Sequence, residues 1–145
     1  MKTKILTTLA TLALAVCVWA LYYLHALWGA GPIRIGLQIA AALLMVWARI
    51  TFGLRSFHFT ANPTHGELIT SGPFRFIRNP IYAAILLFAW AGISSKLTPL
   101  TTLIGLVILA MLLLRIFLEE KELTAHYPDY VAYARQTRRL IPFVL

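Results

Sequence analysis

Five consecutive residues, Arg78–Tyr82, have the types that can bind an anion at the start of a helix. Asn79 is a favoured N-cap residue and Pro80 is favoured at the first helical position, so we predict that a helix begins here. The first N–H groups of such a helix and its positive dipole end attract a carboxylate or a phosphate. The Arg78 guanidinium adds a bidentate donor for the same anion. The same residues also fit an ordinary capped helix that follows an arginine.

Three carboxylates, those of Glu119, Glu120 and Glu122, follow a long apolar run. At the C-terminal end of a helix they oppose the helix dipole, so they need cationic partners. Arg115 precedes Glu119 by four residues and can pair with it on one helix face. A bound organic cation would serve as a further partner, although the solvated end of a membrane helix can carry the same charges.

The C-terminal segment adds aromatic and basic side chains. Tyrosine rings can form walls around an adenine ring, and arginines can bind a carboxylate or a lipid anion. The alternative is an aromatic and basic anchor in the membrane interface. The side chains concerned are Tyr130, Tyr133, Arg135, Arg138 and Arg139.

The composition places these residues in a membrane protein of one domain, residues 1–145. Hydrophobic residues make up 60% of the chain and charged residues 12%, whereas a soluble domain has about 25% charged residues. Lipid must therefore cover part of the surface. The net charge of +8 predicts no nucleic-acid partner, because the cations lie at the ends of apolar runs, where anionic lipids attract them. The single Cys17 excludes a disulfide framework or a Cys-based zinc site within one chain, and we predict no metal site.

Four apolar runs predict an all-α integral-membrane fold with about four transmembrane helices. A helix that crosses the roughly 30 Å hydrocarbon core needs about 20 residues. The third run is shorter, so it must begin in the interface or protein must shield its first turn. The runs cover residues 5–28, 33–50, 80–93 and 97–118.

The first two runs form a predicted N-terminal helical hairpin over residues 1–55. The first run also resembles a signal peptide with a weak lipoprotein cleavage box at Cys17, but it continues well past Cys17, so we expect it to be retained. Beyond Glu119 we expect the last helix to continue to about Tyr127. A short amphipathic helix is then predicted over residues 129–137.

Charge counting orients the chain. With four spans, only Arg34 and Lys96 of the 13 lysines and arginines lie on the side away from the termini. This asymmetry places both termini in the cytoplasm, and we expect a multi-pass protein of the bacterial inner membrane. The cytoplasmic cations are Lys2, Lys4, Arg49, Arg55, Arg75, Arg78, Arg115, Lys121, Arg135, Arg138 and Arg139.

Residues 66–82, Gly-Glu-Leu-Ile-Thr-Ser-Gly-Pro-Phe-Arg-Phe-Ile-Arg-Asn-Pro-Ile-Tyr, resemble a motif of the isoprenylcysteine carboxyl methyltransferase family. In that family, Leu-Val-Thr-x-Gly-Pro-Tyr leads into Arg-His-Pro-x-Tyr. A second block is similar to the family's Glu-Glu…Tyr-x-x-Tyr…Arg-x-x-Pro ending. The resemblance covers a predicted methyltransferase core, residues 66–143, and the wider superfamily includes phospholipid N-methyltransferases and some sterol reductases. The second block contains Glu119, Glu120, Leu123, Tyr130, Tyr133, Arg139, Ile141 and Pro142.

This resemblance implies S-adenosylmethionine as the cofactor, bound on the cytoplasmic side beneath the C-terminal helix. It implies that Glu119 or Glu120 binds the cofactor's ammonium group, and that Arg78 or Arg139 binds its carboxylate together with the helix start. Tyrosines would enclose the adenosine, and positioning and electrostatics would supply most of the rate. The implied catalytic residues are Arg78, Asn79 and Glu120. The implied cofactor-binding residues are Arg78, Asn79, Pro80, Ile81, Tyr82, Glu119, Glu120, Tyr130, Tyr133 and Arg139.

One position departs from the family motif, because Asn79 replaces the histidine before the proline. Asparagine cannot act as a base, and His58, His65 and His126 are more typical of interfacial polar residues. A carboxylate acceptor is already ionised near pH 7 and needs no base. We therefore expect carboxyl O-methylation of an isoprenylcysteine-like acceptor, which is apolar and enters from the bilayer. The alternative is N-methylation of a phospholipid or small lipid.

Two other classes remain open. A sterol-type reductase that uses NADPH would need a site for the extra phosphate, which Arg138 and Arg139 can provide. A non-catalytic membrane scaffold with the same fold would explain Asn79. The lipid bilayer is a partner in every case, and the sequence leaves the oligomeric state open.

Overall fold

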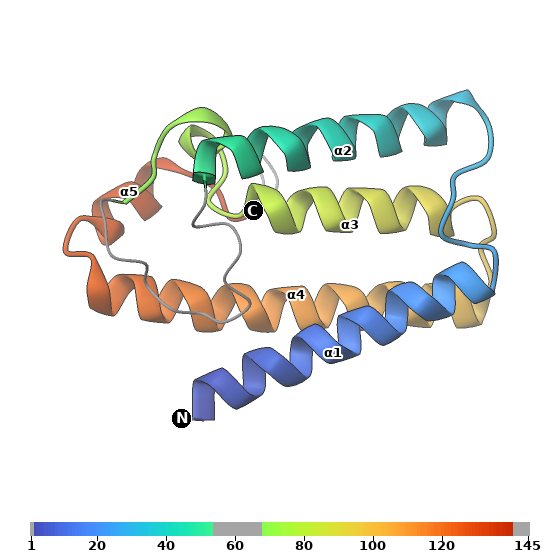
Figure 1. The fold of residues 1–145 in the computed structure, drawn as a ribbon, viewed down its shortest axis with the longest axis horizontal. Coiled ribbons are helices and arrows are strands. Elements are labelled where there is room, and N and C mark those ends of the chain that lie inside the picture. Colours follow the sequence, from blue (N-terminus) through green and yellow to red (C-terminus); the bar gives the residue numbers. More distant parts are fainter. Residues whose placement is uncertain (1, 54–67, 141–145) are drawn as a thin grey trace.

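The computed structural model describes residues 2–53 and 68–140, and in these ranges the chain forms helices and no strand. The all-α class is therefore confirmed. A helix begins at Pro80 as predicted, and the last long helix continues past Glu119. The elements are α1 (Lys2–Tyr23), α2 (Pro32–Phe52), the 3-10 helix η2 (Gly72–Arg75), α3 (Pro80–Ile93), α4 (Pro99–His126) and α5 (Tyr130–Gln136) (Figure 1).

One predicted boundary differs from the structure, and several residues named in the sequence analysis lie outside the described ranges. The predicted first run extends to Trp28, but α1 ends at Tyr23, and the chain then turns toward α2. The short helix predicted over 129–137 is α5. Residues named above that lie outside the described ranges are Arg55, His58, His65, Gly66, Glu67, Ile141 and Pro142.

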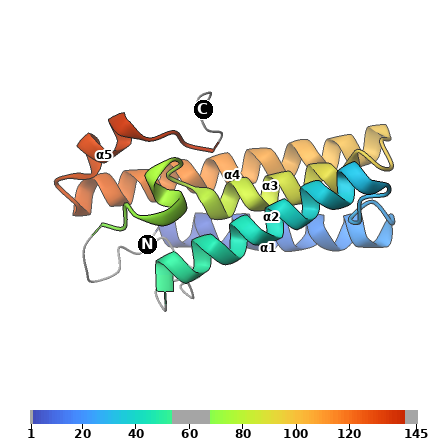
Figure 2. The same cartoon turned by 90° about the horizontal axis from the view of Figure 1, so that it is seen from above.

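The long helices pack as a bundle in which α3 lies between α2 and α4, and α1 packs against α4 (Figure 1 and Figure 2). The buried core joins α1 with α3 and α4. Large apolar side chains such as Leu43 and Leu103 face outward, at 66% and 58% exposure. Outward apolar surface of this extent is what a lipid-covered protein requires. The core consists of Cys17, Leu21, Ala26, Ala89, Ile93, Ile108 and Leu112.

Three helices, α1, α2 and α4, are long and apolar enough to cross a membrane, whereas α3 has 14 residues. At 1.5 Å per residue α3 covers only about 21 Å. Every residue of α3 is buried or half-buried. Protein therefore surrounds the short helix along its whole length, which agrees with the expectation that its first turn is shielded from lipid.

A buried glutamine fixes the turn between α1 and α2 against α3. Gln38 donates hydrogen bonds from Nε2 to the carbonyl oxygens of Leu27 (2.8 Å) and Phe88 (3.2 Å), and its Oε1 accepts from the N–H of Gly29 (2.9 Å). Gly92 of α3 packs directly against this turn, because a Cβ there would lie 2.3 Å from the Leu27 carbonyl oxygen. This close approach sets the position of α3, and hence of its start at Pro80.

We predict that Gly92→Ala destabilises the bundle. The added methyl group meets the backbone rather than a movable side chain, so the expected loss is about 2–3 kcal/mol. Thermal unfolding of the detergent-solubilised protein, followed by circular dichroism, measures it. Gly36→Ala on α2 is the control, because a Cβ there has nothing within 4 Å. An unchanged midpoint for Gly92→Ala would contradict the close packing.

Candidate functional site

The C-terminal tail pairs with the residues that lead into α3. Arg78 N–H donates to the carbonyl oxygen of Arg138 (2.6 Å), and Asn79 N–H donates to that of Arg139 (3.1 Å). The N–H of Arg138 in turn donates to the Phe76 carbonyl (3.2 Å), forming a short parallel bridge. Segments some 60 residues apart in sequence thus share one end of the bundle. We call this end, formed by residues 68–79 and 127–140 together with the C-terminal part of α4 from Glu119, the tail end.

One carboxylate at the tail end collects three of the residues singled out from the sequence. Glu120 Oε1 accepts from Arg78 Nε (3.1 Å) and from Asn79 Nδ2 (3.2 Å), and its Oε2 accepts from Arg139 Nε (3.0 Å). Asn79 is the residue before α3, but its side chain makes no capping hydrogen bond. Asn79 is therefore the N-cap residue of α3, as predicted, but its amide binds the Glu120 carboxylate. We call Arg78, Asn79, Glu120 and Arg139 the Glu120 cluster.

Arg78 also holds the tail in place. Its Nη1 donates to the carbonyl oxygen of Ala134 (2.7 Å) and to that of Thr137, both at the C-terminal end of α5. Its side chain is only 10% exposed, whereas that of Arg139 is 50% exposed. Arg78 therefore joins α3, α4 and α5, and Arg139 is the cation of the cluster that solvent reaches.

The neighbouring carboxylate faces a separate group. Glu119 Oε1 accepts from Arg115 Nη2 (3.1 Å), so the predicted pair four residues apart on α4 is confirmed. The Tyr82 hydroxyl donates to the same oxygen, and Arg115 Nε donates to the Tyr82 hydroxyl (3.1 Å). Arg115 also binds the hydroxyl of Thr11 on α1, a residue that the sequence did not single out. These four residues, the Glu119 cluster, link α1, α3 and α4.

The two predicted tyrosines of the tail pack inside it. Tyr130 is 3% exposed and forms an edge-to-face pair with Tyr133, at 5.9 Å between ring centroids. The Tyr133 hydroxyl donates to the carbonyl oxygen of Phe74 (2.7 Å). Burial raises the pKa of Tyr133 to about 12 and raises the pKa of Tyr130 as well, so both phenols are neutral at physiological pH. Of the other predicted site residues, Pro80 is buried and Ile81 is half-buried in the first turn of α3.

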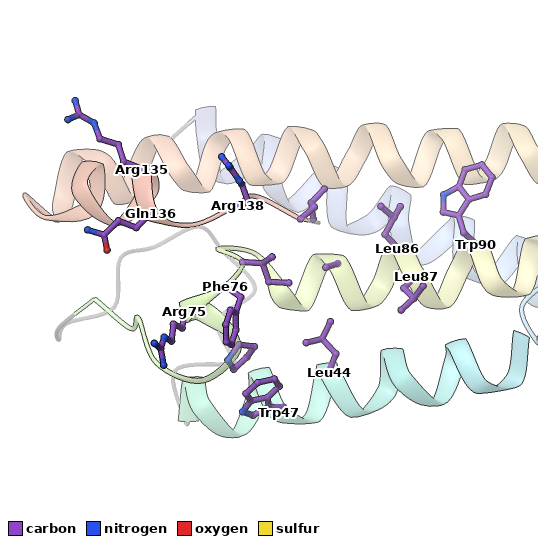
Figure 3. A pocket seen from close by; sticks show the side chains of 14 residues that line it. Leu44, Trp47, Arg75, Phe76, Leu86, Leu87, Trp90, Arg135, Gln136 and Arg138 are labelled. Carbon is purple, nitrogen blue, oxygen red and sulfur yellow. The ribbon is translucent and has the colours of Figure 1, made fainter. Parts of the chain in front are cut away.

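A groove of about 1010 Å³ lies beside the Glu120 cluster, between α2, α3 and the tail (Figure 3). Apolar side chains line its inner part, including Trp47 of α2 and Trp90 of α3, and three arginines lie at the tail end. None of the predicted cofactor-binding residues lines it. The feature of the sequence that points to this groove is the basic tail, which includes Arg135 and Arg138. The third arginine, Arg75, belongs to η2 and was counted only for the orientation of the chain.

Comparison with known proteins gives one match. The family model for phospholipid methyltransferase matches residues 27–130, more than half of the chain. This range includes Arg78, Asn79, Glu119 and Glu120, but it ends before Tyr133 and Arg139. No curated protein and no solved structure matches the chain.

We predict that Arg78→Lys loosens the tail while leaving the helical bundle intact. Lysine keeps the charge but lacks the planar fork that binds one carboxylate and two carbonyl groups together. Each buried carbonyl left without its partner costs about 1–3 kcal/mol. Amide hydrogen exchange over residues 130–137 should therefore be faster, with unchanged exchange in α1. Arg139→Lys, at the solvent-exposed pair, is the control, and equal exchange rates in the two variants would contradict the role assigned to Arg78.

Proposed function

The chain belongs to the phospholipid methyltransferase family, and from this premise we propose that it transfers a methyl group from S-adenosylmethionine to an apolar acceptor embedded in the membrane. The observation that carries the proposal is the Glu120 cluster, in which a carboxylate of α4 meets the residues at the start of α3 and a half-exposed arginine of the tail. A single carboxylate with one half-exposed cationic partner suits a ligand that carries both charges.

The residues of the cluster fit the methionine end of this cofactor, which carries an ammonium and a carboxylate. Arg78 and Asn79 hold Glu120 Oε1 in place, and they leave Oε2 to Arg139. Because Arg139 is half-exposed, it can turn aside. An ammonium would then bind Glu120 Oε2, and a carboxylate would bind Arg139 and the first N–H groups of α3. When bound, the cofactor supplies the electrophilic methyl group.

The remaining cofactor-binding residues surround the cluster. We assign Tyr82, Tyr130 and Tyr133 to the wall against the adenosine, with Glu119 holding Tyr82 in position. Since Tyr130 is only 3% exposed, it contacts a ligand only when the tail moves. This assignment makes α5 and residues 137–140 a cap that opens for the cofactor and excludes water when closed.

For the acceptor, we propose carboxyl O-methylation of an isoprenylcysteine-like compound. The carboxylates of the two clusters, Glu119 and Glu120, are engaged in ion pairs, and Asn79 has no basic group. A carboxylate acceptor is ionised near pH 7 and attacks without losing a proton. The chain's own residues then need only orient the acceptor and exclude water, which is how positioning accelerates a displacement.

A phospholipid or small-lipid acceptor is the second candidate, and the family that matches the chain favours it. Its ammonium group must lose a proton before it can accept a methyl group. Among the described histidines only His126, in the last turn of α4, is on the same side as the clusters, and it contacts Tyr127. The two acceptors therefore differ in the need for a base.

We also propose that the tail end faces the cytoplasm and that α3 is a fourth, protein-covered span. The support is the charge asymmetry of the sequence, with Arg34 and Lys96 at the opposite end of the bundle. A bacterial inner membrane is the proposed location.

Glu120→Gln should weaken S-adenosylmethionine binding by about 10- to 100-fold, because it replaces a charged hydrogen-bond partner of the ammonium with a neutral one. Calorimetry on the detergent-purified protein measures this affinity, with NADPH as the competing ligand. Lys121→Gln, on the exposed side of the same helix, is the control and should bind normally. If Glu120→Gln and Glu119→Gln both bind as tightly as the parent, the site is elsewhere; binding of NADPH alone would favour a reductase.

The acceptor can be identified with cells that do or do not express the protein. Because carboxyl O-methylation forms a methyl ester, labelled methyl groups from methionine should enter a lipid-soluble ester. Mild base should then hydrolyse this ester and release the label as methanol. Under the phospholipid alternative, the label instead resists base and remains in the head-group fraction. An unlabelled ester fraction together with altered head groups would overturn the carboxylate acceptor.

A further inference from the structure

The groove between α2, α3 and the tail is apolar along its length and basic at one end. Leu44 and Trp47 of α2 line it with Leu87 on the α2 side of α3, and Leu86 lines it from the opposite side of α3 (Figure 3). The basic end is formed by η2 and the tail. Trp47 and, in the loop after η2, Phe76 are about half exposed, so the groove opens on the outer surface of the bundle. Its volume of about 1010 Å³ matches the upper range of ligand pockets, and its shape suits an elongated apolar chain.

The charge of the basic end is uncompensated within the described part of the chain. Arg75, Arg135 and Arg138 line the groove there, and no acidic residue is among its lining residues. The Arg75 guanidinium lies over the ring of its neighbour Phe76, at 5.9 Å from the centroid. Arg138 uses its backbone N–H and carbonyl in the parallel bridge, which leaves its guanidinium for a ligand. Three guanidinium groups at the end of an apolar groove are complementary to an amphiphile with an anionic head.

This groove is distinct from the Glu120 cluster, although one stretch of backbone borders both. In an extended segment, successive side chains point to opposite sides. Accordingly Arg138 and Ile77 line the groove, while their neighbours Arg139 and Arg78 bind Glu120. A head group held by Arg138 therefore lies on the far side of this backbone from the Glu120 carboxylate.

We propose that this groove binds a phospholipid whose head group has a net negative charge, with the head group at the end that Arg75, Arg135 and Arg138 line and an acyl chain along α2 and α3. A zwitterionic head group would bring an ammonium to a place where the lining offers no carboxylate to receive it, so a lipid such as phosphatidylglycerol is bound in preference. The inference concerns binding alone, and it does not depend on the proposed methyl transfer.

Tryptophan quenching by brominated lipids tests the proposal. A variant with Trp19, Trp28 and Trp47 replaced by phenylalanine keeps Trp90, the half-buried tryptophan of the groove, as the only reporter. In mixed micelles without cofactor, dibrominated phosphatidylglycerol should quench Trp90 at a lower mole fraction than dibrominated phosphatidylcholine. Loss of each arginine to glutamine should weaken this preference by about fivefold, the effect expected of one cation at a lipid surface.

Two variants separate specific binding from general attraction to anionic lipid. Lys121→Gln removes an exposed cation that does not line the groove, and the preference should persist. Ala83→Phe fills the groove and should remove quenching by both lipids without touching the arginines. Should the Arg75→Gln or Arg135→Gln variant fail to fold, Arg138→Gln alone suffices, because the substitution keeps the backbone bridge. Equal quenching by the two lipids, or a preference unchanged in Arg138→Gln, would overturn the proposal.

Discussion

The carboxylate of Glu120 is where the tail end of this bundle is held together. A charge with only 12% of its side chain exposed, at the end of an apolar bundle, requires cationic and hydrogen-bonding partners. Those partners come from the start of α3 and from the tail, so satisfying one charge brings three elements to one point. Arg78 extends the arrangement to the carbonyl groups that end α5. Without this carboxylate, Arg78 would be the unpaired buried charge.

The short helix α3 depends on the same arrangement. A helix of 14 residues is too short to span the hydrocarbon core while exposed to lipid, and here the bundle leaves none of its residues fully exposed. At one end Gly92 packs against the turn after α1, and at the other the tail pairs with Arg78 and Asn79. Two fixed ends therefore hold α3 at one depth, and with it Tyr82 and the Glu119 cluster.

Much of the fold could be predicted from the runs of apolar residues and from the prolines that mark helix starts. Pro80 and Pro99 mark helix starts, and the apolar runs give the helices their approximate lengths, since these signals act through local backbone geometry. The pair of Arg115 and Glu119 could be predicted for the same reason, because helical spacing alone brings them together. The end of α1 could not, because apolar residues continue on both sides of His25 as far as Trp28, and it is Gln38 from the next helix that binds this turn.

The contacts between the site residues were harder to predict than the identities of those residues. The residue types of Arg78, Asn79 and Glu120 identified them as candidates, but spacing along the chain does not show that the Asn79 amide reaches α4 instead of capping α3. Long-range contacts such as Thr11 with Arg115 leave no local pattern at all. The groove was missed for a related reason, since its walls come from α2, α3 and the tail, and no one segment carries its signature.

The parallel bridge between Ile77 and Arg138 has a further consequence. Because adjacent side chains of this bridge serve opposite faces, the backbone cannot shift toward one face without withdrawing from the other. Binding of a ligand on one face is then thermodynamically linked to binding of a ligand on the other. If the first ligand changes the affinity of the second by some factor, the second changes the affinity of the first by the same factor.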